Sequence, residues 1–504
     1  MSENKQYVSA GIVLILLFAL GFSRVFFLTV FMGGHFSDLA KGNMVKTELI
    51  SAKRGVISDK NGKYLAMNID NNGSLVRYYP MGEIAAGLVG YIGKPSEVGE
   101  NGEILVGKTG LESEYQNRLA GIAGETVVEE TAQGTRRTEI VRKEPVPGEN
   151  LVTNIDLSVQ QMAFSSLKNA LTKVGKSGAV VATTVDGKVL ALVSTPSYDS
   201  NLFVENGKRS DFGGDYKEVN DLLKDDLKKP LFNRALSGDF APGSVYKLVP
   251  ALTSLEEGKI VKDSLIEDSG EIVIGDYRYG NWLLDKYGQT EGKINVVKAI
   301  ARSNDIFFYK IGEAIGVDKL VYWSKKFGLG EKTGIDLPGE SSGFMPSPYW
   351  REKSLGTKWF LGNTYHLAIG QGDVMATPLQ INMMTAAVIS GIKCPPRIVG
   401  SSSCVDLKIG EQNRKTILEG MMAACSHGGT AYPLYEYGGK IYCKTGTAQK
   451  GGEDTLPNAW LTMVIPVGSN VKDWVVVTVL VEEGGEGSTV AAPIAKELVP
   501  LFLK

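Results

Sequence analysis

Histidine is scarce in this sequence of 504 residues, and neither sign of charge is in excess. Lys and Arg total 54 against 56 for Asp and Glu, so the chain lacks the strong basic field that nucleic-acid binding usually needs. The three histidines, His35, His366 and His427, lie far apart and form no metal-ligand spacing. We therefore predict no nucleic-acid partner, no metal and no cofactor, surface or core roles for the histidines, and a base other than histidine.

Cysteine is also rare, and no two cysteines form a C-x-x-C pair. Cys394, Cys404, Cys425 and Cys443 are scattered through the last quarter of the chain. This spacing argues against a structural zinc site. It leaves open whether any of the four forms a disulfide.

Long hydrophobic runs are absent except at the start. Residues 7–22 carry no charge, and the apolar run resumes after Arg24. A spanning helix needs about 20 apolar residues, and no small-residue cleavage site follows. We predict a cytoplasmic tail over 1–6 and an uncleaved single-pass membrane anchor over 7–32. Basic residues do not set its orientation, because one lysine precedes the span and four basic residues follow it.

The soluble part divides at a proline-containing break over 143–148. Residues 33–149 predict a small α+β pedestal or dimerisation domain, with strand-like runs over 55–59 and 88–92. A strand-like alternation over 150–156 then opens a second domain, which we place at 150–504.

The second domain has strands near both of its ends. Apolar spacing predicts a helix over 157–174, followed by a hairpin of strands 178–185 and 188–193 that turns at Asp186-Gly187. Two more strands are predicted over 459–466 and 473–481, and a helix over 490–503. The fold class is therefore α+β, with a central antiparallel sheet covered by helices.

A serine and a lysine one helical turn apart supply a nucleophile and a base without histidine. Pro242 and Gly243 precede Ser244, and the apolar spacing that follows predicts a helix with Ser244 in its first turn. Lys247 then shares its face. Burial and the helix N-terminus would disfavour the charged lysine. By itself this motif is more often a helix cap and a solvated lysine.

Two further motifs follow in a fixed order. Ser303-Asn304-Asp305 opens an apolar stretch, and Lys444-Thr445-Gly446-Thr447 leads towards the terminal strands. S-x-x-K, S-D-N and K-T-G in this order are the signature of penicillin-recognising serine enzymes. The chain resembles class B penicillin-binding proteins, the monofunctional transpeptidases. Further stretches that carry the resemblance are Arg54–Gly62, Gly110–Glu112, Asn233–Leu236, Gly370–Asp373 and Ala376–Gln380.

The resemblance implies a peptidoglycan D,D-transpeptidase that is acylated at Ser244 and inhibited covalently by β-lactams. Lys247 would be the base, and Ser303 would relay a proton to the leaving amine. Asp305, which stands where Asn is commoner, would bond Lys247 or the substrate. Lys444 would hold the substrate carboxylate.

The remaining site residues lie in the same K-T-G segment. Thr445 and Thr447 would bind the carboxylate beside Lys444, and Gly446 would allow close approach of the substrate. Backbone N–H groups of Ser244 and Thr447 would form the oxyanion hole.

The resemblance also implies partners and a location. The substrates would be stem peptides of glycan strands derived from lipid II. The partner would be a polytopic glycosyltransferase of the shape, elongation, division and sporulation type, and residues 316–340 look slightly more like elongation enzymes. The catalytic domain would lie outside the cytoplasmic membrane.

Three alternative functions use the same motifs. A class A β-lactamase needs a carboxylate that activates the deacylating water and is generally released, whereas this chain retains an anchor. A D,D-carboxypeptidase would pass the acyl group to water instead of an amine. A β-lactam sensor or a scaffold of a wall-synthesis complex would not turn over.

Overall fold

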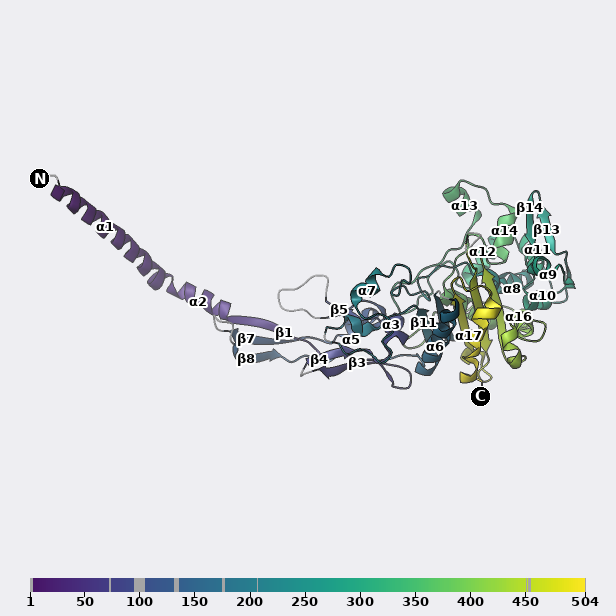
Figure 1. Cartoon of the computed structure of the whole chain (residues 1–504), viewed down its shortest axis with the longest axis horizontal. Coiled ribbons are helices and arrows are strands. Elements are labelled where there is room, and N and C mark those ends of the chain that lie inside the picture. Colours follow the sequence, from purple (N-terminus) through teal and green to yellow (C-terminus); the bar gives the residue numbers. More distant parts are fainter. Residues whose placement is uncertain are drawn as a thin grey trace. The chain divides into compact units, whose positions relative to one another are not determined.

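The computed structural model describes residues 3–71, 74–94, 105–130, 136–174, 177–205, 207–449, 451 and 455–503. The chain forms two compact units (Figure 1). The first unit comprises residues 1–53, 94–104 and 120–148, and the second comprises 54–93, 105–119 and 149–504. The division of the soluble part at residue 150 stays a prediction.

The first unit contains the predicted anchor. Helix α1 (Glu3–Phe26) continues through a π-helical turn, η1 (Phe27–Phe31), to α2 (Gly33–Met44). Within residues 5–31, an 18-residue stretch reaches a mean hydropathy of 2.4, and none of that stretch is buried in the protein. The length and composition fit a single-pass membrane anchor. The unit also holds a three-stranded antiparallel sheet in the order β1-β7-β8: β1 (Val45–Ile50), β7 (Gly124–Glu130) and β8 (Arg136–Lys143).

The second unit begins with a four-stranded sheet in the order β4-β3-β2-β9, in which β2 and β9 run parallel. The strands are β2 (Ile57–Ser58), β3 (Tyr64–Asn71), β4 (Ser74–Tyr78) and β9 (Leu151–Val152). The strand predicted over 88–92 is wrong except at Ile92. Leu88 and Val89 end helix α3 (Ala86–Val89), and β5 (Ile92–Gly93) starts only after Gly90, which has a φ of 76°.

A buried ion cluster joins two of the segments that carried the family resemblance. Glu112 of helix α4 (Gly110–Glu114) accepts from Arg54 Nε at 2.6 Å and from Arg77 Nε at 2.7 Å. Tyr79 Oη lies 3.3 Å from the same carboxylate, and Glu112 is fully buried. Two arginines paired with one carboxylate satisfy charges that would otherwise be costly to bury.

The large sheet has five antiparallel strands in the order β11-β10-β20-β19-β18. The hairpin prediction is confirmed, because β10 and β11 pair directly, and so are both predicted strands near the C-terminus. The strands are β10 (Gly178–Thr184), β11 (Val189–Thr195), β18 (Tyr442–Ala448), β19 (Asn458–Ile465) and β20 (Val475–Val481). The continuous apolar runs of β19 and β20 are explained by burial on both faces.

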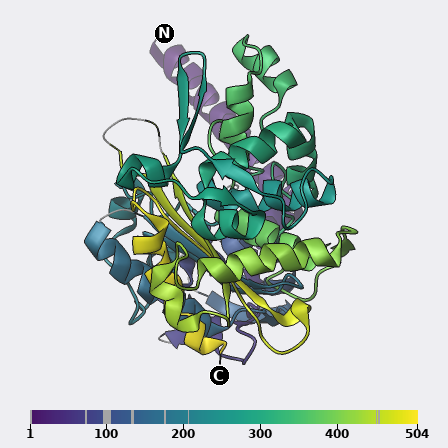
Figure 2. The ribbon, with the colours of Figure 1, turned by 90° about the vertical axis from the view of Figure 1, so that its right-hand side faces the viewer.

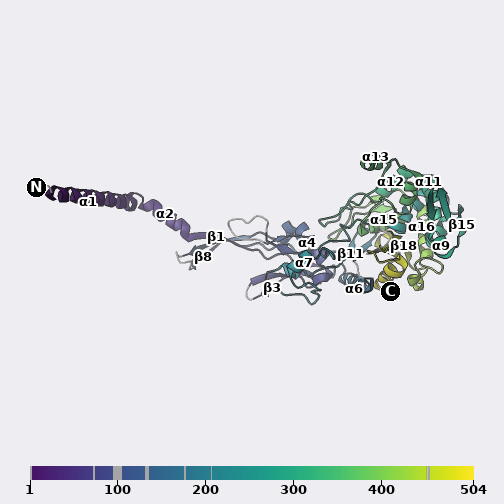
Figure 3. The same cartoon turned by 45° about the horizontal axis from the view of Figure 1, so that its top comes forward.

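Helices cover both faces of this sheet, as predicted. Helix α6 (Leu157–Val174) matches its predicted bounds and packs with α17 (Ala492–Lys496) against one face. On the other face lie α8 (Leu248–Glu256), α10 (Val296–Arg302), α11 (Asp305–Ile315), α15 (Pro378–Ser390) and α16 (Glu411–Ala424). Figure 2 shows this teal and green helical region beside the yellow strands, and Figure 3 shows α16 near β18.

One feature of this unit differs from the sequence predictions, and the structure supplies one that the sequence left open. The helix predicted over 490–503 is broken into η7 (Gly487–Ala491), α17 and η8 (Val499–Leu501), because proline lacks the N–H that a continuous helix requires. The four cysteines form two disulfides, Cys394–Cys404 and Cys425–Cys443.

Candidate active site

The predicted nucleophile lies at the start of a helix, as expected. Residues Gly243–Lys247 form a 3₁₀ turn, η4, that continues into α8. In a 3₁₀ turn the side chains at i and i+3 are eclipsed, so Ser244 and Lys247 share one face. Gly243 has a φ of 56°, and its N–H donates to the Gly370 carbonyl at 2.8 Å. Ser244 is partly exposed, whereas Lys247 is fully buried.

Lys247 forms hydrogen bonds with two residues of the Ser303-Asn304-Asp305 motif. Its Nζ lies 2.6 Å from Asp305 Oδ1, and it donates to the Ser303 carbonyl at 2.9 Å and to Ser303 Oγ at 3.4 Å. Burial lowers the pKa of Lys247 from its ordinary 10.5, and the negative charge of Asp305 opposes this shift. The neutral amine that a base requires is therefore favoured by burial and disfavoured by Asp305.

Lys444 contacts the same hydroxyl of Ser303. It lies on β18, is fully buried, and donates to Ser303 Oγ at 2.8 Å and to the Thr445 carbonyl at 2.9 Å. Burial lowers the pKa of Lys444 well below 10.5, and the nearby charge of Lys247 lowers it further. Its predicted contact with the substrate carboxylate stays a prediction.

The backbone presents the Ser303 hydroxyl between the two lysines. Ser303 caps the C-terminus of α10 with a φ of 54°, in the left-handed region. The next residue, Asn304, is the N-cap of α11, where its side chain accepts from the Phe307 N–H at 2.9 Å. Asn304 also donates to buried Asp268 at 2.7 Å. The sharp junction between two capped helices thus fixes a serine that sequence spacing alone could not orient.

A cavity of about 780 Å³ connects the predicted site residues. It is lined by Ser244, Ser303, Asp305, Thr445, Gly446 and Thr447 among others, whereas Lys247 and Lys444 lie behind this lining. β18 is an edge strand of the sheet, and edge strands present unpaired backbone groups. Gly446 packs tightly, since a Cβ there would lie 3.1 Å from Val245 Cγ1.

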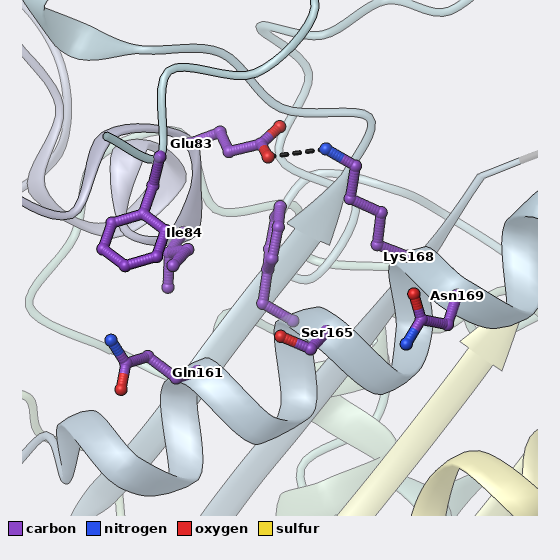
Figure 4. Close-up of a pocket in the computed structure, with 8 residues that line it drawn as sticks. Glu83, Ile84, Gln161, Ser165, Lys168 and Asn169 are labelled. Atoms are coloured by element: carbon purple, nitrogen blue, oxygen red, sulfur yellow. Dashed lines mark hydrogen bonds and ion pairs between the residues drawn. The ribbon is translucent and has the colours of Figure 1, made fainter. Parts of the chain in front are cut away.

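A second cavity, of about 490 Å³, holds none of the predicted site residues. It lies between α6 and residues 83–84 and 212. Figure 4 shows the ion pair between Lys168 and Glu83 at its edge, at 2.5 Å. The chemistry predicted from the sequence therefore belongs to the larger cavity.

Several residues of the larger cavity were missed by sequence reasoning. His366, at the end of helix α14 (Leu361–Ala368), lines it, although a surface or core role was expected. Burial lowers the pKa of His366, and Asp373 opposes the shift. Its position four residues before the Gly370–Asp373 stretch was the available signal. Lys286 and Glu486 also line the cavity, and no motif marked them.

Comparison with known proteins agrees with the geometry. Residues 177–500 match the family described as the penicillin binding protein transpeptidase domain, and residues 69–153 match the penicillin-binding protein dimerisation domain. The first match covers more than half of the chain. The chain therefore belongs to the penicillin-binding transpeptidases, and the predicted class B arrangement is confirmed.

Individual relatives point to one branch of the family. The chain is 31% identical over 502 residues to the peptidoglycan D,D-transpeptidase MrdA of Acinetobacter baumannii. This match covers 91% of this chain and 70% of that protein. It resembles the PBP2 chain of a complex with MreC from Helicobacter pylori, at 27% identity and a TM-score of 0.75, over 91% of this chain and 99% of that one. A chain of a peptidoglycan synthase complex matches at 28% identity and a TM-score of 0.79, over 99% of both chains.

Proposed function

We propose that this chain is a peptidoglycan D,D-transpeptidase that cross-links stem peptides through an acyl-enzyme at Ser244 and is inhibited covalently by β-lactams. One observation supports this most strongly. The Ser303 hydroxyl accepts from both buried lysines, Lys247 and Lys444, beside the cavity that Ser244 lines. Such a constellation supplies a nucleophile, a base and a proton relay without histidine.

In the first half-reaction, Ser244 Oγ bonds to the carbonyl carbon of the penultimate D-alanine of the donor stem. Lys247 accepts the hydroxyl proton. The C–N bond to the last D-alanine breaks, and the proton passes from Lys247 through Ser303 Oγ to the leaving amine. The 3.4 Å and 2.8 Å contacts of Ser303 with the two lysines suit a hydroxyl that both donates and accepts.

Substrate binding would use the edge strand β18. The hydroxyls of Thr445 and Thr447 and the charge of Lys444 would hold the terminal carboxylate of the donor. The N–H groups of Ser244 and Thr447 would stabilise the oxyanion. These two backbones are neighbours, since a Cβ on Gly243 would lie 2.9 Å from the Thr447 carbonyl oxygen.

In the second half-reaction, an amine of a neighbouring stem attacks the acyl carbon. A new N–C bond forms, the C–O bond to Ser244 breaks, and the amine proton returns to Ser244 Oγ by way of Lys247. The cavity, at about 780 Å³, is large enough to hold parts of two peptides.

The location and partners follow the family. We assign residues 1–6 to the cytoplasm, 7–32 to the membrane, 33–149 to the pedestal and 150–504 to the transpeptidase domain, outside the cytoplasmic membrane. The complexes of the similar chains favour an elongation-type assembly. The partner would be a polytopic glycosyltransferase acting on lipid II, contacted through the anchor and pedestal.

Product analysis tests the proposed activity. The full chain in detergent is incubated with a pentapeptide-bearing donor stem and a tetrapeptide-bearing acceptor stem. A cross-linked dimer and free D-alanine are expected with the wild type, and neither with Ser244→Ala. Shortened monomers without dimers would identify a D,D-carboxypeptidase, and intact stems would identify a sensor or scaffold.

A further inference from the structure

Two residues that line the cavity beside Ser244 form an ion pair with each other. Lys286, on helix α9 (Trp282–Tyr287), is paired with Glu486, which lies just beyond β20. The two residues are 200 positions apart in the chain, and both line the cavity that contains Ser244 and Thr447. Neither residue belongs to a motif that the proposed mechanism uses.

Glu486 is held close to the reacting groups. The N–H of the next residue, Gly487, lies 3.4 Å from Thr447 Oγ1. A Cβ on Gly487 would lie 2.3 Å from the Gly446 carbonyl oxygen, so the backbone is pressed against the strand that would bind the donor. The Glu486 carboxylate is therefore placed beside this strand by the fold.

The other charged side chains that line the cavity form ion pairs or hydrogen bonds with residues that do not line it. Asp305 is bonded to Lys247, Asp285 to Arg278, and Arg302 to Glu291 and the Gly428 carbonyl. Among the residues that the structure describes, Lys286 and Glu486 are the ion pair whose two members both line the cavity.

This pair can be exchanged for contacts with a ligand. The side chains are 48% and 45% exposed, and ion pairs at that exposure contribute little to stability. A ligand with an ammonium and a carboxylate on one carbon would replace the pair by two new ones, without leaving either charge unpaired. A ligand with only an ammonium would pair with Glu486 and leave Lys286 without a partner.

We propose that Lys286 and Glu486 recognise the acceptor stem, and that they select an acceptor amine whose carbon also carries a carboxylate. Lys286 binds the carboxylate, and Glu486 binds the ammonium. The ammonium gives one proton to water before the neutral amine attacks, and its next proton passes to Ser244 Oγ by way of Lys247. This inference rests on the proposed transpeptidase function and names the class of acceptor that the same site takes.

The test compares two matched acceptors, D-methionine and D-methioninamide, which differ in the carboxylate. The full-length protein is acylated with a small D-alanyl thioester, and the ratio of aminolysis to hydrolysis is measured for each acceptor. This ratio is independent of how fast the acyl-enzyme forms. We expect the wild type to favour D-methionine, and Lys286→Gln to lower its ratio about tenfold, the effect of one lost charge-assisted contact, with a smaller change for the amide.

Two further variants separate recognition from a merely structural latch. Exchanging the charges, as Lys286→Glu with Glu486→Lys, keeps an ion pair but reverses its polarity, so it should not restore the ratio for D-methionine. Lys262→Gln removes a comparable surface pair with Glu419 outside the cavity and should leave both ratios unchanged. Recovery in the exchanged variant, an equal loss for both acceptors in Lys286→Gln, or no aminolysis by the wild type would overturn the proposal.

The failure of the proposed function would look different. If fluorescent penicillin does not label Ser244 of the wild type, the transpeptidase assignment fails, and the acceptor site fails with it. If labelling at Ser244 is normal and both acceptors give aminolysis at the same ratio, only the acceptor site is refuted. If labelling is normal but neither acceptor gives aminolysis, the transpeptidase function fails as well.

Discussion

Two substitutions of Ser303 can distinguish the role of its hydroxyl in proton transfer from the role of its backbone conformation. The buried Lys444 ammonium donates to the Ser303 hydroxyl at 2.8 Å and to the Thr445 carbonyl at 2.9 Å. The backbone of Ser303 has a φ of 54°. Ser303→Ala removes the hydroxyl and keeps a side chain in the left-handed region. Ser303→Gly removes the same hydroxyl and also relieves the backbone, because glycine adopts positive φ freely.

The two variants should differ in stability but not in activity. Losing a hydrogen bond to a charged group costs about 1.5–3 kcal/mol, and we expect Ser303→Ala to lose that much. The glycine variant should be about 1–2 kcal/mol more stable than the alanine variant, from the left-handed cost alone. Acylation should fall by about 10²–10⁴-fold in both, the usual contribution of a positioned proton-transfer group.

Urea unfolding and stopped-flow acylation by fluorescent penicillin measure the two quantities. Both variants keep the Ser303 carbonyl that accepts from Lys247 at 2.9 Å, so this contact is common to them. Acylation near the wild-type rate in Ser303→Gly would refute the relay. A much faster glycine variant than alanine variant would place the defect in the backbone instead.

Three further outcomes follow from contacts in the second unit. The rate of acylation should rise with pH through an ionisation below 10.5, because burial lowers the pKa of Lys247. Asp305→Asn removes the negative charge that raises this pKa, so the midpoint of the pH–rate profile should move to lower pH. A midpoint that moves to higher pH would contradict the role of Lys247 as the base. Gly446→Ala places a methyl group 3.1 Å from Val245 Cγ1, next to the nucleophile. The variant should lose about 1–3 kcal/mol of unfolding free energy in urea and should be acylated more slowly. An unchanged acylation rate would count against this close packing. Glu112→Gln leaves two buried arginines without their anion and should lower the free energy of unfolding by about 3–5 kcal/mol. Thermal melting measures this loss, and an unchanged melting temperature would show that the ion cluster is dispensable.

The sequence predicted the elements whose periodicity is set by burial. The helix over 157–174 and the strands of the large sheet follow from apolar spacing, and the structure has them at nearly the predicted bounds. The predictions failed where single residues override the pattern. Gly90 ends a helical turn within the run predicted as a strand, and Pro493 and Pro500 divide the last predicted helix.

The sequence predicted several residues that line one cavity, but it did not predict the geometry in which they meet. Motif order identified Ser244, Ser303 and Lys444, yet nothing local to Ser303 indicates a left-handed residue or a hydroxyl shared by two lysines. The cavity residues from other elements, such as Lys286 and Glu486, carry no spacing signal because tertiary packing brings them to the cavity. An even number of cysteines in a part of the chain predicted outside the cytoplasm was the available hint of disulfides.

Peptide mapping of the penicillin adduct tests the identity of the nucleophile most directly. The full chain is treated with benzylpenicillin, digested and analysed by mass spectrometry. We predict one adduct with the full mass of the drug, because opening of the β-lactam ring expels no group, on the peptide that contains Ser244. An adduct on another residue, or an adduct that persists in Ser244→Ala, would contradict the account.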